Sequence, residues 1–450
     1  MKNSPSLPKE FEERMRAELG AGFNAFQESL QLPSPISIRL NPLKQGLIAG
    51  DPIPWTRNGR YLSNRPGFTL DPTFHAGAFY VQEASSMLLE QAVIQSADLN
   101  QPLRVLDLCA APGGKSTHLL SLINSDSLLV SNEVIRSRAT VLSENIQKWG
   151  HGNVVVTSSD PKNFNRLEGF FDIIVVDAPC SGEGLFRKDP DAMSEWSEEN
   201  VLFCSHRQQR ILADVWPSLK QDGILIYSTC TYNEKENDDN LQWLNENKNV
   251  EFVPLTLDTH WGIEEFKHGN IAGYRCYPHR VNGEGFFISV IRKKESQASS
   301  RIHSKNSFQW ASRKIKEGLS DWLLPHNHEL VMLDDLIVSL PGRYVSEIDF
   351  ISRTLNTVLK GTAIAKQKHD KFIPEHSLAL AVQLNKTNFK CIELTLEQAL
   401  TYLRKDTLLV GEGARGFALV MYQQMPMGWV NLLGTRINNL YPSGWRILMR

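Results

Sequence analysis

The chain contains 450 residues, of which 41% are hydrophobic and 22% are charged, with a formal net charge of −2. These values are typical of a soluble protein of about three domains that can bury a sizeable core. No stretch approaches the roughly 18 apolar residues of a membrane span, and the first residues contain no apolar signal-peptide core. We therefore expect a cytoplasmic protein without a membrane partner.

The cysteines and the charges narrow the protein class further. The six cysteines form neither a CxxC pair nor a metal-ligand spacing, so we expect reduced thiols, no disulfide framework and no metal site. Residues 301–450 contain 19 Lys and Arg against 13 Asp and Glu, whereas the first 300 residues carry a balance of −8. This asymmetry is consistent with a C-terminal part that faces a polyanion, and equally with a solvated basic surface.

The first 90 residues predict a small α+β unit. A helical pattern covers 11–30, and the alternating segment 36–41 predicts a short strand. Connections rich in Gly and Pro separate these elements. The segment YVQEASSM, residues 80–87, is expected to begin an apolar helix that leads into the next domain.

Residues 103 to 293 alternate apolar runs with helical patterns, which is typical of βαβ units and a mostly parallel sheet. The expected strands cover 103–108, 127–132, 153–157, 171–177, 222–229 and 285–292. The expected helices cover 115–123, 136–149, 201–219 and 234–245. The sequence therefore predicts the α/β class.

A polar stretch near 294–306 has the composition of a linker. Beyond it, alternating runs at 378–384, 407–411 and 416–422 surround a helix at 395–405, which predicts a mixed α/β region ending in a small barrel. The expected division is an N-terminal unit (1–90), an α/β domain (91–293), a linker (294–306) and a C-terminal region (307–450).

The segment 170–190 carries the first candidate for catalysis. Its apolar run, interrupted only by Asp172, is typical of a strand buried on both faces. Asp177 and Cys180 follow in a loop constrained by Pro179 and two glycines. Because open α/β sheets bind ligands at the carboxyl ends of their strands, this pattern alone favours Cys180 as a nucleophile.

The loop after the first expected strand admits two interpretations. Gly114, Lys115 and Ser116 match the end of a P-loop, but Cys109 stands where the first P-loop glycine is required. The alternative is a Rossmann-like nucleoside site, in which small residues let the backbone approach the ligand. Its loop would comprise Cys109, Ala110, Ala111, Pro112, Gly113, Gly114 and Lys115.

Acidic residues follow three successive strands, at Glu133, Asp160 and Asp177. Glu133 lies 19 residues past Gly114 and fits the acid that binds ribose hydroxyls, and Asp160 is placed to meet an adenine. Each acid alone would be read as a solvated loop carboxylate. Three acids in register at successive strand ends favour the nucleoside site.

A second cysteine, Cys230, ends the strand expected at 222–229. A buried cysteine near a strand end is usually inert packing, but Cys180 and Cys230 are expected in one sheet.

The motifs LDLCAAPGGKST, DAPCSGEG and STCTYNEKEN, with SIRLNPLK, YVQEASSM, RCYPH and GEGFF, resemble the Nol/Nop/Sun family of RNA (cytosine-5)-methyltransferases over about residues 30–293. The tail GTRINNLYPSGWR resembles the appended PUA-like RNA-binding domain of the bacterial small-subunit rRNA methyltransferase F branch.

This resemblance implies a Rossmann-like sheet that binds S-adenosyl-L-methionine through Cys109 to Lys115, Glu133, Asp160 and Asp177. It also assigns the cysteines differently from the strand pattern. By the resemblance, Cys230 is the attacking nucleophile and Cys180 is the cysteine that assists product release.

The chemistry of cytosine gives these groups their expected roles. Carbon 5 is too electron-poor to accept a methyl group until a thiolate has added to carbon 6. Lys115 is the expected source of positive charge for that thiolate, and Asp177 near N3 would offset the charge that builds on the ring. Because the target atom is inaccessible in a stacked helix, we expect the base to be extruded.

The sequence thus predicts a methyltransferase that modifies carbon 5 of a cytosine in RNA, most plainly 16S rRNA, with the small ribosomal subunit as a partner and a monomeric state. The alternatives are an enzyme acting on tRNA, an amino-group methyltransferase, which has no use for a second thiol, and a noncatalytic RNA-binding assembly factor. Residues expected to hold RNA are Trp429, Tyr441, Trp445, Arg436 and Arg446, although the tryptophans are equally suited to a barrel core.

Overall fold

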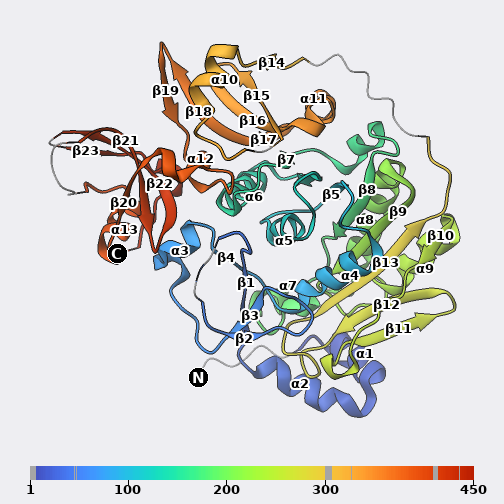
Figure 1. The fold of residues 1–450 in the computed structure, drawn as a ribbon. Coiled ribbons are helices and arrows are strands. Elements are labelled where there is room, and N and C mark those ends of the chain that lie inside the picture. The colour runs from blue at the N-terminus through green and yellow to red at the C-terminus, as the bar shows by residue number, and fades with distance from the viewer. Residues whose placement is uncertain are drawn as a thin grey trace.

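The computed structural model describes residues 7–44, 46, 48–298, 307–325, 327–408, 414–434 and 436–449. Its strands form four sheets, and Figure 1 shows the largest one surrounded by the N-terminal elements and by the two C-terminal sheets. Within the described residues, no helix combines the length and apolar character that crossing a membrane requires.

The N-terminal elements are two helices followed by a four-stranded sheet of order β2-β3-β1-β4. The helices are α1 (Lys9–Leu19) and α2 (Phe23–Gln31), and the strands are β1 (Ile36–Leu40), β2 (Asp51–Pro52), β3 (Gly59–Leu62) and β4 (Phe79–Val81). The helix expected from residue 80 is wrong at its start, because Tyr80 and Val81 pair with β1 as strand residues. A 3-10 turn (Ser85–Leu88) then leads into helix α4 (Leu89–Ser96).

The central sheet has the strand order β11-β12-β13-β9-β8-β5-β6-β7-β17, and β10 also pairs with β13. Its parallel strands are β5 (Arg104–Asp107), β6 (Leu128–Asn132), β7 (Val154–Thr157), β8 (Phe171–Asp177) and β9 (Leu219–Thr229). Antiparallel strands extend it, namely β10 (Val250–Phe252), β11 (Glu264–His268), β12 (Ile271–Cys276), β13 (Phe286–Lys293) and β17 (Thr357–Lys360).

All six strands expected between 103 and 293 are present, and so are the four helices, with small shifts at their ends. The helices are α5 (Gly114–Leu122), α6 (Arg136–Trp149), α8 (Glu198–Val215) and α9 (Asp238–Asn247), with a short α7 (Pro190–Glu195) before α8. The sequence prediction missed β10, β11 and β12. Strand β11 is largely exposed and charged, so it lacks the apolar run on which the prediction relied.

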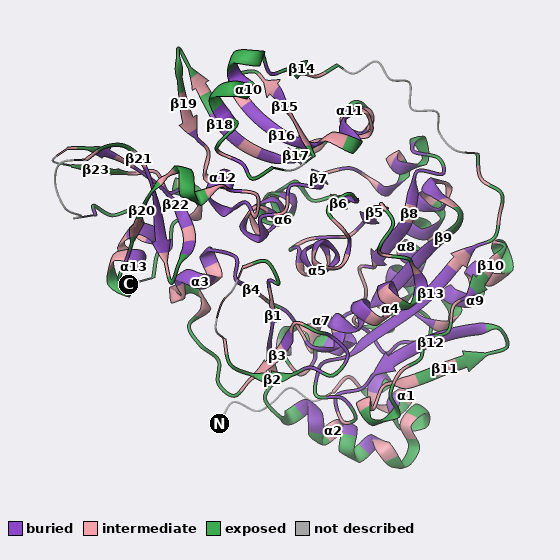
Figure 2. Cartoon of the chain, viewed as in Figure 1, coloured by how far each residue is buried: buried purple, intermediate pink, exposed green. Residues whose placement is uncertain are grey.

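Helices cover both faces of the sheet, which explains the continuous apolar run of β8. Ile174 and Val176 belong to one core cluster with residues of α8, while Ile173 and Val175 belong to a second cluster with residues of α5 and α6. Figure 2 shows these central strands as buried. The sheet therefore has the doubly covered architecture in which ligands bind at the carboxyl ends of parallel strands.

The C-terminal part contributes two more sheets. The first contains β14 (Gln309–Trp310), β15 (His328–Leu333), β16 (Leu336–Pro341), β18 (Thr362–Lys368) and β19 (Lys371–Pro374), with helices α10 (Arg313–Leu319) and α11 (Val345–Thr354). The second contains β20 (Lys390–Glu393), β21 (Arg415–Tyr422), β22 (Met425–Leu433) and β23 (Ile437–Asn439), with helix α13 (Leu396–Arg404). In addition, β17 pairs with β7 and extends the central sheet at its edge.

The expected run at 378–384 is wrong as a strand. Residues His376–Leu380 form helix α12, whose buried Leu378 and Leu380 contact neighbouring elements, so a fully apolar helical turn imitated a strand pattern. The run at 416–422 corresponds to β21 and the helix at 395–405 to α13. Residues 409–411 of the expected run at 407–411 and most of the expected linker lie outside the described residues.

Candidate active site

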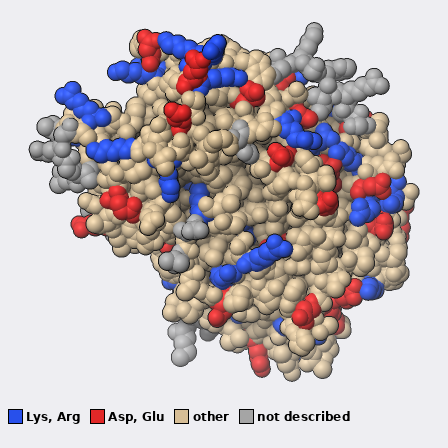
Figure 3. Space-filling model, viewed as in Figure 1, with Lys and Arg blue, Asp and Glu red and all other residues tan. Residues whose placement is uncertain are grey.

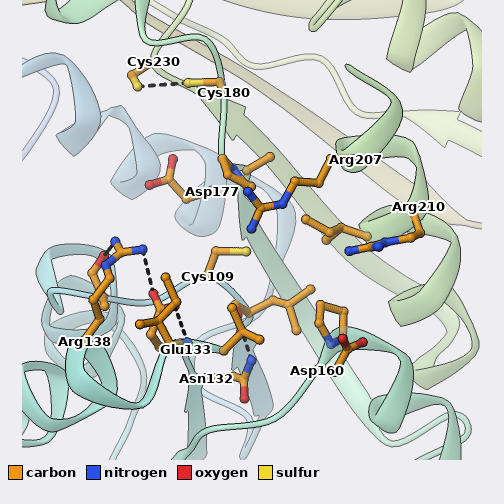
Figure 4. A pocket seen from close by; sticks show the side chains of 18 of the residues that line it. Cys109, Asn132, Glu133, Arg138, Asp160, Asp177, Cys180, Arg207, Arg210 and Cys230 are labelled. Atoms are coloured by element: carbon orange, nitrogen blue, oxygen red, sulfur yellow. Dashed lines mark hydrogen bonds and ion pairs between the residues drawn. The ribbon is translucent and has the colours of Figure 1, made fainter. Parts of the chain in front are cut away.

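A cavity of about 250 Å³ opens at the carboxyl ends of the parallel strands. Figure 4 shows side chains from the loops after β5, β6, β7, β8 and β9 and from helix α8 pointing toward it. The lining residues include Cys109, Ala111, Asn132, Glu133, Arg138, Asp160, Asp177, Pro179, Cys180, Arg207, Arg210 and Cys230. The structure thus brings both expected cysteines and all three expected acids to one cavity.

Lys115 and Asp177 form an ion pair beside this cavity, with Lys115 Nζ 2.7 Å from Asp177 Oδ2. The hydroxyl of Ser228, on the neighbouring strand β9, donates to Asp177 Oδ1 at 2.9 Å. Burial disfavours the ammonium of Lys115, but the Asp177 carboxylate outweighs this effect, so the pKa of Lys115 is raised. The Asp177 carboxylate that lines the cavity is therefore paired with a fixed ammonium.

Cys180 and Cys230 lie beside each other at the ends of β8 and β9, with their Sγ atoms 3.0 Å apart. The pKa of Cys180 is raised well above its ordinary value, chiefly by the hydrogen bond to Cys230 and further by burial. A thiol with a raised pKa keeps its proton and can donate it. The two thiols therefore share one hydrogen bond, in which either sulfur can be the donor.

The third cysteine of the cavity, Cys109, is not suited to nucleophilic attack. Burial and the nearby carboxylates of Asp107, Asp177 and Glu133 raise the pKa of its thiol. Since only a thiolate attacks efficiently, the position of Cys109 suits a lining residue and not a nucleophile.

A buried carboxyl group, Glu236, joins the two cysteine loops. It accepts hydrogen bonds from the backbone N–H of Ser181 at 3.0 Å and from the Ser181 hydroxyl. That hydroxyl also lies 3.1 Å from the hydroxyl of Thr231. Ser181 and Thr231 directly follow the two cysteines, so this network fixes the position of one cysteine relative to the other. Burial raises the pKa of Glu236 to about 7.

The other expected acids occupy the opposite part of the cavity. The carboxylate of Glu133 accepts from the backbone N–H of Ile135 at 3.0 Å and pairs with Arg138 at 3.2 Å. Asp160 begins the 3-10 helix η4 (Pro161–Arg166) and accepts from the backbone N–H of Lys162 at 3.1 Å. Both side chains line the cavity and retain acceptor capacity, which fits the hydroxyl and amino groups of an adenosine.

The loop 109–115 supplies the remaining part of such a site. It runs from the end of β5 to the start of α5, and Gly113, with φ 116°, precedes the helix. A left-handed backbone at this point favours glycine and lets the loop turn tightly beside the cavity. Behind the loop, the fully buried Asp107 accepts the Ser116 hydroxyl at 2.6 Å, and burial raises its pKa to about 7.

The N-terminal elements hold the loops from outside. The buried guanidinium of Arg39 donates to Gln82 at 2.9 Å and to the carbonyl of Gly114 at 3.2 Å, which fixes the start of α5. Arg14 of α1 pairs at 2.7 Å with Glu183, which is fully buried in the loop after Cys180. Arg39 belongs to the motif SIRLNPLK and Gln82 to the motif YVQEASSM. These two motifs therefore support the cavity from outside and do not line it.

Sequence reasoning missed Arg138, Arg207, Arg210 and the role of Glu236. Arg207 and Arg210 lie one turn apart on α8 and extend toward the cavity in Figure 4. Because Arg207 and Arg210 are three residues apart, the sequence indicated that they share one side of the helix. No motif in the helix indicated that this side faces the cavity.

The aromatic residues expected to stack on RNA are mostly unavailable for it. Trp429 and Tyr441 are buried in the C-terminal core. Trp445 is partly buried and contacts His376. The expectation of stacking is therefore wrong for Trp429 and Tyr441. In Figure 3, Lys and Arg side chains nevertheless lie over the two C-terminal sheets and extend toward the middle of the face.

Three protein-family models match the chain. Residues 95–292 match the 16S rRNA methyltransferase RsmB/F model, residues 7–84 match the N-terminal domain of 16S rRNA methyltransferase RsmF, and residues 389–447 match the methyltransferase RsmF PUA domain. The matched ranges together contain the four N-terminal strands, the cavity and the last sheet.

Curated relatives span nearly the whole chain. Proteins described as ribosomal RNA small subunit methyltransferase F from Salmonella paratyphi A and Salmonella typhi are 32% identical over 468 residues, covering 97% of this chain and 96% of theirs. Among solved structures, a methyltransferase homolog from Pyrococcus horikoshii is 29% identical with a TM-score of 0.55, covering 64% of this chain and 95% of that one. An NSun6 structure from the same organism, determined with SFG, has a TM-score of 0.55 at 20% identity, covers 64% of this chain and 99% of that one, and shows the same fold.

Proposed function

Because the chain belongs to the family of ribosomal RNA small subunit methyltransferase F, an S-adenosylmethionine-dependent family with an RNA-binding PUA domain, we propose that it methylates carbon 5 of a cytosine in 16S rRNA. The observation that carries this proposal is the pair of sulfur atoms, Cys180 Sγ and Cys230 Sγ, 3.0 Å apart beside the Lys115–Asp177 ion pair. Two thiols at adjoining strand ends suit a reaction that forms and then breaks a bond to the base.

S-Adenosylmethionine, when bound, supplies an electrophilic methyl group. We assign its binding to the loop 109–115 and to Glu133, Asp160 and Asp177, which surround the cavity. Glu133 would accept the ribose hydroxyls, and Asp160 would meet the adenine. The glycines of the loop permit the close backbone approach that such a ligand needs.

Cys230 acts as the nucleophile in this proposal. Its sulfur lies 3.0 Å from that of Cys180, whose raised pKa favours keeping the shared proton on Cys180. The thiolate adds to carbon 6 of the extruded cytosine, a C–S bond forms, and the π electrons move toward carbon 5, which becomes nucleophilic. Attack on carbon 6 thus activates carbon 5 for methylation.

Lys115 and Asp177 stabilise the charge that moves onto the ring. The ion pair can hold a proton between Lys115 Nζ and Asp177 Oδ2, which are 2.7 Å apart, and present it toward N3 of the base. Hydrogen bonding at N3 offsets the negative charge of the adduct, as preorganised donors do for other anionic intermediates. The Ser228 hydroxyl keeps the carboxylate oriented.

Product release requires loss of the carbon 5 proton and cleavage of the C6–S bond. We assign Cys180 to this step. Its raised pKa depends first on the hydrogen bond to Cys230, and that effect disappears once the sulfur of Cys230 is bonded to carbon 6. Cys180 can then lose its proton to solvent and accept the proton of carbon 5. The C–H electrons form the C5=C6 double bond, and Cys230 departs as a thiolate, which restores the starting state of both cysteines.

Two further parts of the assignment concern the substrate and the setting. We propose a monomer that acts in the cytoplasm and contacts the small ribosomal subunit, and tRNA is the alternative substrate class. An amino-group methyltransferase is disfavoured because it has no use for paired thiols. A noncatalytic assembly factor is disfavoured because it would not need the thiol pair, the ion pair and the acids in one cavity.

The test uses 16S rRNA transcribed with tritium at carbon 5 of cytosine, incubated with the full-length protein and S-adenosylmethionine. Methylation at carbon 5 must release tritium to water in a one-to-one ratio with methyl transfer. Bisulfite sequencing of the product, in parallel with tRNA and with assembled subunits, identifies the nucleotide and the substrate. Methyl transfer without tritium release would exclude carbon 5 as the acceptor.

A further inference from the structure

The exposed face of helix α8 contains Phe203, His206, Arg207 and Arg210, and we propose that this α8 face binds the unpaired RNA strand that flanks the target cytosine. The proposal rests on the proposed function, because it concerns how the substrate strand reaches the same cavity.

The spacing of these four residues places them on the same side of helix α8. Positions 203, 206, 207 and 210 follow an i, i+3, i+4, i+7 pattern and fall on one side of the helix. The opposite side is packed into the sheet through Val201, Cys204, Gln208, Ile211 and Leu212, which are all buried. The helix is therefore firmly anchored and presents the α8 face on a rigid support.

Phe203 is the aromatic member of the α8 face, and 64% of the residue is exposed. It lies one helical turn from Arg207, which lines the cavity. An exposed aromatic ring in this position is suited to stacking on an unpaired base, whatever the identity of that base. Leu185, in the loop after Cys180, is a second exposed apolar side chain, 36% exposed. Leu185 itself lines the cavity.

Arg207 and Arg210 supply the positive charge of the α8 face. Both line the cavity, and among the residues that the structure describes neither guanidinium group forms a hydrogen bond or an ion pair. Burial raises the pKa of Asp214 and the charge of Arg210 opposes that rise, but these two described residues do not form an ion pair. Two guanidinium groups without protein partners, one helical turn apart, are available for the phosphates on either side of an extruded nucleotide.

The combination favours an unpaired strand over a duplex. In a duplex the bases are stacked on one another, so Phe203 would find only phosphates and sugars. The target base must also leave its stack to reach Cys230, and holding the flanking phosphates and one flanking base would keep it extruded. The continuity of the α8 face with the cavity places these contacts directly beside the extruded base.

The experiment measures RNA binding in the Cys230→Ala background, so that the result does not depend on catalysis. The probe is a fluorescein-labelled RNA of mixed sequence with a central cytosine, used single-stranded and annealed to its complement. The test variants are Phe203→Ala and the double change Arg207→Met with Arg210→Met. A matched control removes two exposed charges elsewhere, Lys267→Gln with Lys294→Gln.

We expect each α8 variant to weaken single-strand binding about tenfold, while the control stays near the parent and duplex binding changes little. For the double Arg variant, the slope of log affinity against log salt should fall by about 1.4, since roughly 0.7 is lost for each phosphate contact on a single strand. S-Adenosylhomocysteine binding, measured by calorimetry, should be unchanged in Phe203→Ala, because Phe203 is not among the residues that line the cavity. Equal losses for the control or the duplex, or a parallel loss of S-adenosylhomocysteine affinity in Phe203→Ala, would overturn the proposal.

Discussion

Cys180 and Cys230 are separated by 50 residues in sequence, yet their sulfur atoms lie 3.0 Å apart. The reason is the pairing of β8 with β9 as parallel neighbours, which brings both carboxyl ends to the same edge of the sheet. The register pairs Asp177 with Ser228, so the two loops begin at the same level. The two thiols can therefore act on one base at successive stages of a reaction.

The two cysteines should have separable roles. Cys230→Ala should abolish methyl transfer, because the nucleophile that activates carbon 5 is lost. Cys180→Ala should still form the C–S bond but release the product slowly, so a covalent protein–RNA adduct should accumulate on a denaturing gel. An adduct that forms with Cys230→Ala and not with Cys180→Ala would reverse the assignment of nucleophile and releasing residue.

The same proximity predicts that the pair can be oxidised. Diamide accepts two electrons from two thiols, so it should convert Cys180 and Cys230 to a disulfide and remove the nucleophile. Peptide mapping by mass spectrometry should find this linkage, and dithiothreitol should restore methyl transfer. Cys204, which burial leaves with a pKa of about 11, serves as the internal comparison and should remain unmodified under the same treatment.

Lys115 should matter for the chemical step more than for folding. Lys115→Met removes the ammonium that lies 2.7 Å from Asp177 and leaves a side chain of similar length. If the pair stabilises charge on the ring, single-turnover methyl transfer should slow by about 10² to 10⁴, the usual range for a positioned proton donor. Unfolding in urea provides the control. A variant that transfers methyl groups at the parent rate would remove Lys115 from the mechanism.

Glu236 should make stability depend on pH. Its pKa is raised from 4.5 to about 7 in the folded protein because burial disfavours the carboxylate. A carboxyl group with a raised folded pKa contributes stability that is fully present below pH 4.5 and is lost as the pH rises through about 7. The neutral variant Glu236→Gln should lack this loss. In urea unfolding between pH 4.5 and 8, the free energy of unfolding of the parent should therefore fall relative to that of the variant as the pH rises. Parallel plots of the two free energies against pH would contradict the prediction.

Local patterns in the chain predicted the α/β class and the six strands and four helices between 103 and 293. They also predicted which acids and cysteines line the cavity. Apolar runs identify buried strands, and Glu133, Asp160, Asp177, Cys180 and Cys230 all come directly after such runs. Because parallel strands deliver their carboxyl ends to one edge, order along the chain was enough to predict that these residues meet.

Other features depended on contacts between distant segments, which no local pattern records. Helix α12 was mistaken for a strand because its apolar residues pack between other elements, and β17 joins the central sheet through β7, 200 residues earlier in the chain. Only the three-dimensional structure shows that Glu236 accepts a hydrogen bond from Ser181 and that Arg39 and Arg14 hold the loops of the site. The same is true of which side of helix α8 is exposed. The sequence by itself determined which residue types stand at the strand ends. Tertiary structure decided the distances between them, because those distances are set by strand pairing and by buried polar contacts between segments that are far apart in the chain.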